Sequence, residues 1–309
     1  MADNSSLIGG ESKQQQINYR VIIVQLLVMI FLCINLLLIE TFFKKEFLYT
    51  TTRYILYVVT LLSDSFILLM SDVLLILTFF QITMHVWLCI IITVLVLLYL
   101  MVTPVTLTAM TLERYVAICM PLRHGELCST RSAINCILII HSLSSVPCIV
   151  VLSNFFASAS LSLYEQHSLC LCSVEIFILF RWHDHIRSAV HQIYFLIMCI
   201  TIVFCYFKIM KVAKTASGEN RKSTWKGLRT VILHAFQLLL CLIQLWCPFI
   251  EAAVLQINFR LFINVRYFNY IMFSLAPRCL SPLIYGLRDE KYFLELKKYA
   301  FFGLYNKKY

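Results

Sequence analysis

The sequence predicts an all-α membrane protein, a seven-transmembrane helix bundle with a short amphipathic helix on the inner face. Of its 309 residues, 61% are hydrophobic and only 14% are charged, and the mean hydropathy is +0.82. A soluble domain of this length needs more polar surface than these residues can supply. The apolar residues fall into seven runs that can each cross a bilayer, which takes about 20 residues. These runs cover 21–43, 54–80, 86–110, 132–152, 188–210, 228–252 and 261–286.

The basic residues set the expected orientation. Most of the 26 Lys and Arg follow the first, third, fifth and seventh runs, and loops rich in Lys and Arg stay on the cytoplasmic side. We therefore expect residues 1–20 to be extracellular, 21–287 to form the transmembrane domain in the plasma membrane, and 288–309 to be a cytoplasmic tail. The third inner loop, near 211–227, is polar and contains Gly, which predicts a flexible turn. Apolar residues at helical spacing predict the amphipathic helix of the tail; they are Phe293, Leu296 and Ala300.

Of the 13 cysteines, only Cys89, Cys170 and Cys172 are expected on the oxidising outer side. The others lie in predicted spans or on the reducing side, where Cys acts as a small apolar residue. Cys89 begins the third span, and the other two lie in the long second outer loop. We expect a disulfide from Cys89 to either Cys170 or Cys172, with one thiol left over. On the same side, Asn4 begins a triplet that fits a glycosylation acceptor.

The stretch from Met110 to His124 places Glu113, Arg114 and Tyr115 at the inner end of the third span. An Arg near the bilayer core needs a partner, and Glu113 beside it suggests a clamp that can be broken and remade. The stretch resembles the junction of the third helix and second inner loop of odorant receptors. These are a branch of the rhodopsin-like G-protein-coupled receptors, and the likeness is greatest to the fish-type members.

Other motifs carry the same resemblance. The sixth run keeps Lys226, Thr230 and His234 at the family's spacing, and the seventh keeps Pro282 and Tyr285 but has Ser281 where the family has Asn. The resemblance implies that Arg114, Tyr206 and Tyr285 rearrange on activation. It also matches Asn35 and Asp64 to positions that carry Asn and Asp across rhodopsin-like receptors. The simpler interpretation is that these two polar groups hydrogen-bond to one another between helices.

Arg278 lies one helical turn from Pro282, where an unpaired cation is costly. Our hypothesis is that Arg278 pairs with Asp64, at the place where related receptors hold a sodium ion. The alternative is that Arg278 turns toward water or a loop carbonyl.

A ligand pocket is expected among the outer halves of the third, fifth and sixth spans, whose apolar residues suit a small ligand. The candidates there are Val96, Leu97, Leu100, Met101, Ile193, Tyr194 and Leu245, with polar contacts from Asp72, His191, Gln192 or Glu251. Two acids favour a cationic odorant, unless Arg266 or Arg260 neutralises Glu251. Trp246 is expected one turn below the pocket, where it either senses the ligand or is only a packed bulky residue.

The resemblance implies a receptor that binds a small-molecule odorant and activates a heterotrimeric G protein of the stimulatory, olfactory type. A non-olfactory receptor for an amine, lipid or peptide is the alternative. A transporter or channel is disfavoured because no repeats or broken facing helices occur, and an enzyme because no catalytic cluster forms. The net charge of +10 is not interleaved with aromatic residues, so the lipid bilayer and not nucleic acid is the expected partner. We expect no metal and no cofactor, since His167-x-x-Cys170 and His183-x-His185 lie in an outer loop.

Overall fold

The computed structural model describes residues 3–158, 167–169, 181–215, 218–286 and 294. Within these ranges the side chains of 3–18, 158, 167–169, 181–184, 218–224, 226–227 and 284–286 are not described. The predicted tail helix and both candidate cysteines of the second outer loop therefore lie outside the described residues.

Within the part of the chain that the structure describes, six helices are long and apolar enough to cross a membrane. Their apolar runs agree with the predicted spans, and each helix continues beyond the run at one end or both. The six are α1 (Asp3–Phe43), α3 (Thr52–Phe79), α4 (Val86–Cys119), α6 (Thr130–Ser158), α8 (Arg181–Thr215) and α9 (Gly218–Leu255). Two short helices, α2 (Glu46–Tyr49) and α5 (Pro121–Leu127), connect α1 to α3 and α4 to α6.

The seventh crossing is built from three consecutive pieces: α10 (Phe259–Asn269), the π-helical η2 (Tyr270–Leu275) and α11 (Ala276–Gly286). They follow one another without a gap and cover the predicted run 261–286. The π-helical turn lies just before Pro277, which has no N–H to donate to the carbonyl of Phe273. The seventh crossing is thus a helix with a local change of pitch, and the all-α seven-helix prediction is confirmed.

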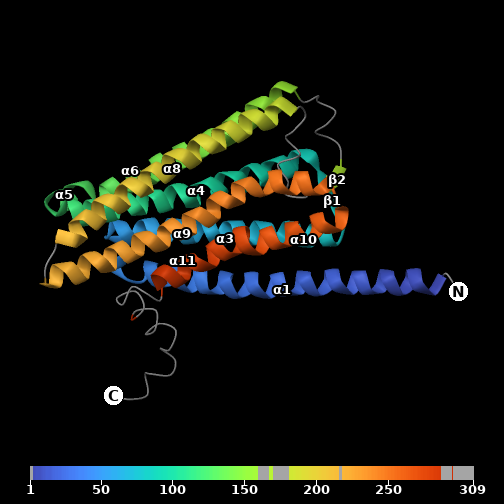
Figure 1. The fold of residues 1–309 in the computed structure, drawn as a ribbon, viewed down its shortest axis with the longest axis horizontal. Helices are drawn as coiled ribbons and strands as arrows, with labels where there is room; N and C mark the ends of the chain where they lie inside the picture. The colour runs from blue at the N-terminus through green and yellow to red at the C-terminus, as the bar shows by residue number, and fades with distance from the viewer. Residues whose placement is uncertain (1–2, 159–166, 170–180, 216–217, 287–293, 295–309) are drawn as a thin grey trace, which may run out of the picture.

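The helices run side by side, with α5 at one end of the bundle and the strands β1 and β2 at the other (Figure 1). We call these the α5 end and the sheet end. Helix α4 is central, because it contacts α3, α6, α8 and α9. The main core lies around it, with Leu61 of α3, Val102 of α4 and Leu242 of α9 among its buried members. The core therefore ties the crossings together along their length.

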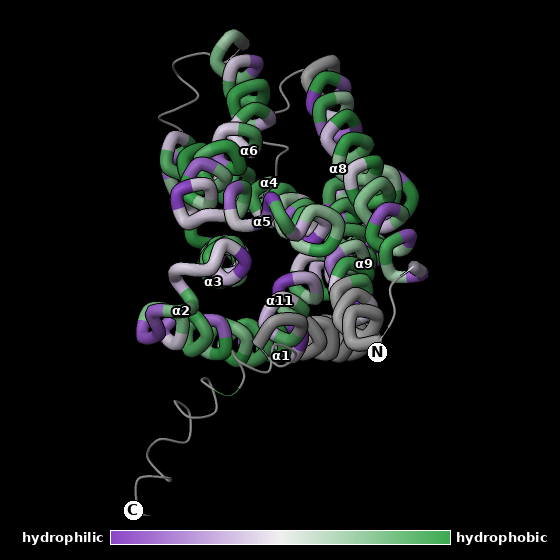
Figure 2. The backbone as a smooth tube through the Cα atoms, turned by 90° about the vertical axis from the view of Figure 1, so that its left-hand side faces the viewer, coloured by the Kyte–Doolittle hydropathy of each residue, from purple (hydrophilic) through white to green (hydrophobic). Residues whose placement is uncertain are grey.

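The outer faces of the bundle are apolar as well. Seen from the α5 end, hydrophobic positions dominate the long helices (Figure 2). Large apolar side chains are exposed on several crossings, among them Ile22, Leu26, Leu138, Ile149, Ile197, Ile200, Phe236 and Leu239. Soluble proteins rarely expose such continuous apolar surface, whereas lipid tails solvate it. The protein is a multi-pass membrane protein.

Two local features differ from the sequence prediction. Residues Thr83–His85 (β1) pair antiparallel with His167–Leu169 (β2), with Met84 opposite Ser168. This small sheet was not predicted, because three-residue strands leave no period in the sequence. The flexible turn predicted near 211–227 was wrong in extent, since α8 continues to Thr215 and α9 begins at Gly218. Its Lys, Arg and Glu residues are good helix formers, so a polar composition did not exclude a helix.

Candidate functional site

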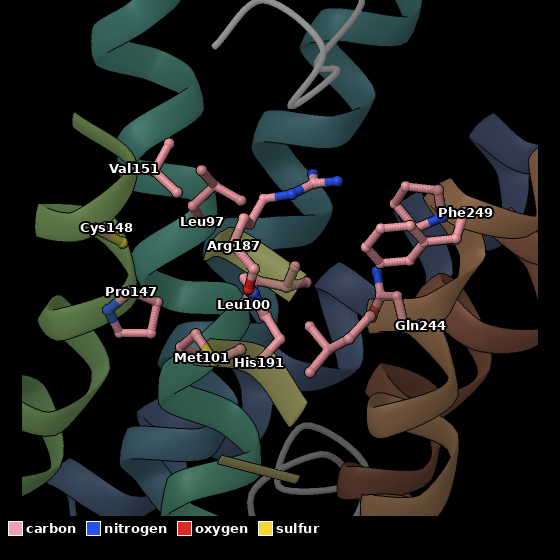
Figure 3. Close-up of a pocket in the computed structure, with 12 residues that line it drawn as sticks. Leu97, Leu100, Met101, Pro147, Cys148, Val151, Arg187, His191, Gln244 and Phe249 are labelled. Carbon is pink, nitrogen blue, oxygen red and sulfur yellow. The ribbon is translucent and has the colours of Figure 1, made fainter. Parts of the chain in front are cut away.

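A cavity of about 50 Å³ lies in the half of the bundle nearer the sheet end, between α4, α6, α8 and α9 (Figure 3). One water needs about 10–15 Å³ on this measure, so the space suits an occupant of a few heavy atoms. Its apolar wall is made by Leu97, Leu100, Met101, Pro147, Cys148, Val151, Leu245, Pro248 and Phe249, and its polar side chains are Arg187, His191 and Gln244.

The structure brings only part of the predicted pocket together. Leu97, Leu100, Met101 and His191 line the cavity, as does Leu245. Val96 and Gln192 do not, because each follows or precedes a lining residue by one position and so points about 100° away around its helix. Gln192 is exposed and donates to Ser188 Oγ (3.2 Å). The cavity thus includes residues of the three expected spans and also Pro147, Cys148 and Val151 of the fourth, and the ligand pocket itself stays a prediction.

Trp246 also lies outside the cavity wall. Its side chain is 46% exposed and meets Phe249 edge to face, with 6.5 Å between the ring centroids. Trp246 lies on the lipid side of α9, two positions after Gln244. Trp246 therefore does not line this cavity, and both interpretations of the residue stay predictions.

The two acids proposed for the pocket do not meet there. Glu251 forms an ion pair with Arg266 (Oε2···Nε 3.8 Å) and accepts a hydrogen bond from Asn269 Nδ2 (3.0 Å). Asp72 lies on α3 beside Gln25 of α1. An acidic pocket for a cationic odorant is therefore not formed, and Arg266 is the residue that neutralises Glu251.

The cavity instead contains a cation that sequence reasoning missed. Arg187 is only 9% exposed, and its guanidinium lies over the ring of Phe249, 5.2 Å from the centroid. It stands one position before the predicted fifth span and was treated as a loop residue. Its spacing from His191 is the available signal, because residues four apart share a face of a helix.

A second missed feature is a polar stripe on α9. Gln237, Gln244 and Glu251 are seven residues apart, which is about two helical turns, so they share one face. Each contacts the seventh crossing: Gln237 Nε2 donates to Ser281 Oγ (2.6 Å) and to Pro277 O (3.0 Å), and Gln244 Oε1 accepts from Arg278 Nη1 (2.6 Å). Together with the contacts of Glu251, these hydrogen bonds join α9 to the seventh crossing at three levels. We call Gln237, Gln244 and Glu251 the α9 polar stripe.

Arg278 and Asp64 are brought together in the centre of the bundle. Both side chains are fully buried, and Nε of Arg278 lies 3.9 Å from Oδ1 of Asp64. The guanidinium also donates through Nη1 to the carbonyls of Ser274 (3.0 Å) and Phe273 (3.3 Å). Phe273 is the carbonyl that Pro277 leaves without its usual helical donor. The π-helical turn thus supplies hydrogen-bond acceptors for the buried guanidinium. The free-energy cost of burying this charge is offset by several partners together.

Asp64 is held by hydroxyl groups from two other crossings. Thr103 Oγ1 donates to Oδ1 (3.1 Å), and Ser281 Oγ donates to Oδ2 (2.6 Å). Asn35 is also fully buried, but its amide makes no hydrogen bond to the side chains that the structure describes. Asn35 and Asp64 therefore do not hydrogen-bond to one another through their side chains in this structure. Ser281 takes up the place of an Asn in this network, bonded to both Asp64 and Gln237.

At the α5 end, Glu113 lies between two basic groups. Its Oε2 is 3.4 Å from Arg114 Nε, and its Oε1 is 3.4 Å from His124 Nε2 on α5. Glu113 is 8% exposed and Arg114 15%. The expected clamp is present in geometry, and His124 is a further partner that the sequence did not suggest.

Aromatic residues beside this clamp link three crossings. Tyr115 of α4 and Tyr206 of α8 both pack on the buried cluster of Ile209, Leu228 and Val231. His234, one turn along α9 from Val231, is fully buried, and Pro282 on α11 is buried. The side chain of Tyr285 is not described, so its part in the set is untested.

Near the sheet end, Cys89 at the start of α4 is buried against Leu74 and is disulfide-bonded. Its candidate partners, Cys170 and Cys172, follow β2, which pairs with the segment just before α4. The choice between them lies outside the described residues, as does the side chain of Asn4. Within the described part of the chain, no group of His, Cys, Asp and Glu is placed to hold a metal.

Seven membrane crossings around a buried polar centre, with a cavity in one half and an Arg–Glu clamp at the opposite end, define a seven-helix membrane receptor. A family model described as "7 transmembrane receptor (rhodopsin family)" matches residues 34–285. Odorant receptor 131-2 of Danio rerio is 43% identical over 303 residues, 98% of this chain and 92% of that protein. Galanin receptor 2a of Danio rerio is 29% identical over 209 residues, 62% of this chain and 53% of that protein. The chain belongs to the odorant receptors of the rhodopsin family of seven-transmembrane receptors.

Proposed function

We propose that this protein is a G-protein-coupled odorant receptor of the plasma membrane. A small molecule binds in the cavity near the sheet end, and a stimulatory, olfactory-type G protein binds at the α5 end. We keep the orientation predicted from the basic residues, in which the N-terminus is outside the cell and the α5 end is in the cytoplasm. Its main structural support is the 2.6 Å hydrogen bond from Arg278 to Gln244, because Gln244 lines the cavity while Arg278 belongs to the polar centre.

Ligand binding acts first on α9. An occupant of the cavity contacts Gln244 and Phe249, and so favours one position of α9 relative to the seventh crossing. The α9 polar stripe offers a set of hydrogen bonds that can be exchanged when α9 shifts. A ligand changes the population of two states only by its difference in affinity for them, and a direct contact on Gln244 supplies such a difference.

Movement of α9 then reaches the α5 end. Leu228 and Val231 of α9 pack against Tyr115 and Tyr206, so an outward swing of α9 uncovers the inner ends of α4 and α8. Arg114 leaves Glu113 and receives the tail of the G-protein α subunit. The carboxylate of Glu113 stabilises the inactive position of Arg114, with His124 as its second neighbour.

Two substitutions at the clamp test this function in cells that carry a cyclic-AMP reporter. Glu113→Gln removes the charge that holds Arg114 and should raise basal signalling several-fold. Arg114→Ala should abolish signalling while surface expression stays normal. Basal signalling from Glu113→Gln no higher than from wild type, at equal surface expression, would contradict the proposal.

The second candidate is a non-olfactory receptor of the same family, which the likeness to galanin receptor 2a favours. The size of the cavity, about 50 Å³, suits a small molecule better than a peptide. The site of expression separates the two candidates. Transcripts confined to olfactory neurons support odour detection, and broad expression supports the alternative.

A further inference from the structure

The carboxylate of Glu113 has a second partner that the proposed activation step leaves in place. We propose that His124 is a proton sensor at the α5 end. Its protonated imidazole holds the carboxylate of Glu113 once Arg114 has left, so acidification of the cytoplasm raises signalling. This inference rests on the proposed receptor function and adds a regulator to the same clamp.

The two oxygens of Glu113 are divided between two basic groups. Oε2 lies 3.4 Å from Nε of Arg114, and Oε1 lies 3.4 Å from Nε2 of His124. Both separations exceed the roughly 2.7–2.9 Å of a strong charge-assisted hydrogen bond. Neither partner therefore holds the carboxylate tightly. The charge on His124 is the part of this balance that changes with pH.

The burial of Glu113 gives the second partner its importance. Glu113 is buried, and a buried carboxylate that loses its cation is strongly destabilised. When Arg114 turns toward the G protein, another cation must take its place or the active state bears this cost. In an imidazolium both ring nitrogens carry protons, so Nε2 of His124 then donates to Oε1. The side chain of His124 is 39% exposed, and protons from the cytoplasm reach it.

Helix α5 is attached to parts of the bundle other than α9, the helix that moves on activation. The backbone N–H of Cys128 donates to the carbonyl of His124 (2.9 Å). The carbonyl of Cys128 accepts from Thr52 Oγ1 on α3 (2.7 Å), and Ser132 Oγ on α6 donates to the carbonyl of Leu127 (2.6 Å). The imidazole therefore stays beside the carboxylate while α9 swings outward.

Protonation of His124 favours the active state. In the inactive state the charge of Arg114 opposes a proton on His124, and the carboxylate is shared between the two groups. In the active state Arg114 has left, and the carboxylate attracts that proton without competition. A proton that binds the active state more strongly shifts the population toward it. Imidazoles ordinarily change charge between about pH 5 and 8, a range that includes the pH of the cytoplasm.

Other charged and titratable groups surround the clamp on the helices packed against α4. Exposed ones include Arg123 and Glu126 of α5, Arg131 of α6, Lys208 and Lys211 of α8, and Arg229 of α9. On α3, Nη2 of Arg53 donates to the hydroxyl of Tyr54 (2.6 Å). Arg, Lys and Glu side chains ordinarily do not titrate between about pH 6 and 8. Burial raises the pKa of the Cys128 thiol, and the charge of Glu113 adds to this increase, so the thiol stays neutral. His234 of α9 is fully buried.

The test measures guanine-nucleotide exchange on a purified stimulatory G protein, with receptor in lipid nanodiscs and no ligand. Each rate is divided by that of empty nanodiscs at the same pH, which removes the pH dependence of the G protein itself. From about pH 7.8 to about pH 6.8 the wild-type rate should rise several-fold, below the roughly tenfold limit for uptake of one proton. His124→Gln retains a donor but cannot be charged, so its rate should be the same at both pH values.

His124→Lys carries a permanent charge at the same position. At the higher pH it should match or exceed the rate that wild type reaches at the lower pH, an increase that loss of folding cannot produce. The matched control is His185→Gln, which removes an exposed histidine of α8 in the other half of the bundle and should keep the wild-type pH dependence.

A wild-type rate that does not change with pH overturns the proposal. A pH dependence that persists in His124→Gln also overturns it, because the proton then binds another group, such as Glu113 itself or His234. Glu113→Gln is measured in the same nanodiscs. Exchange by Glu113→Gln at the rate of empty nanodiscs overturns the receptor function, whereas rapid exchange by Glu113→Gln beside a pH-independent wild type overturns only the role of His124.

Discussion

Gln244 lines the cavity and accepts a 2.6 Å hydrogen bond from Nη1 of Arg278. Arg278 in turn lies 3.9 Å from the carboxylate of Asp64, which is hydrogen-bonded to Thr103 and Ser281. One amide thus separates the cavity from a fully buried ion pair. An occupant that moves Gln244 must therefore change the surroundings of Arg278.

Replacing Gln244 with Leu keeps most of the volume but removes the acceptor of Arg278 Nη1. A hydrogen bond to a charged group contributes about 1.5–3 kcal/mol, so the melting temperature of the purified receptor should fall measurably. Agonist potency should fall as well, because ligand contact no longer reaches Arg278. Gln192→Leu on the exposed face of α8 is the matched control. An unchanged melting temperature in Gln244→Leu would show that the hydrogen bond from Arg278 to Gln244 does not stabilise the fold.

Breaking the Asp64–Arg278 pair from one side should cost more stability than removing both charges. Arg278→Met leaves a buried carboxylate without its cation, and such losses are about 3–5 kcal/mol. The double variant Asp64→Asn with Arg278→Met should recover part of that loss. Thermal unfolding of the two single variants and the double variant closes the cycle. Purely additive losses would mean that the two groups do not interact.

Sodium should have little effect on this receptor. The guanidinium of Arg278 lies beside Asp64, at the place where related receptors hold the ion, and like charges exclude one another there. Replacing NaCl with choline chloride should shift agonist potency by less than about twofold. A strong sodium effect that disappears in Asp64→Asn is the result this geometry does not allow.

Glu251 should act on structure and not on ligand choice. It joins α9 to α10 through Arg266 and Asn269, and Arg266 is 41% exposed, so Glu251→Gln should cost less than about 1 kcal/mol. The order of agonist potencies should be the same in Glu251→Gln and Asp72→Asn as in wild type. Dose–response curves with cationic, anionic and neutral odorants that activate the receptor check this. Loss of the response to a cationic agonist in either variant would return the acids to the binding site.

The sequence was sufficient for the crossings, and it offered the proximity of Arg278 and Asp64 as one of two hypotheses. Apolar runs of span length leave few alternatives in a bilayer, and a cation at that depth has few possible partners. The same reasoning could not decide which side of its helix each residue faces. Val96 and Leu97 are equally apolar, and only the packing of α4 against α6 and α8 puts Leu97 at the cavity.

Arg187 and Gln244 were not predicted as cavity residues, for two different reasons. Arg187 stands at the boundary of an apolar run, where a basic residue is usually a loop residue. Gln244 is one neutral polar side chain inside a long apolar helix. Its seven-residue spacing from Gln237 and Glu251 was a usable signal. The partners of that stripe on the seventh crossing, including the π-helical turn that frees carbonyls for Arg278, depend on tertiary packing.

Guanine-nucleotide exchange on a purified stimulatory G protein tests the central claim most directly. Wild-type receptor, Glu113→Gln and Arg114→Ala are each reconstituted in lipid nanodiscs with the heterotrimer. Glu113→Gln should accelerate exchange above the wild-type rate, and Arg114→Ala should match empty nanodiscs. Exchange by Glu113→Gln at the rate of empty nanodiscs would contradict the account.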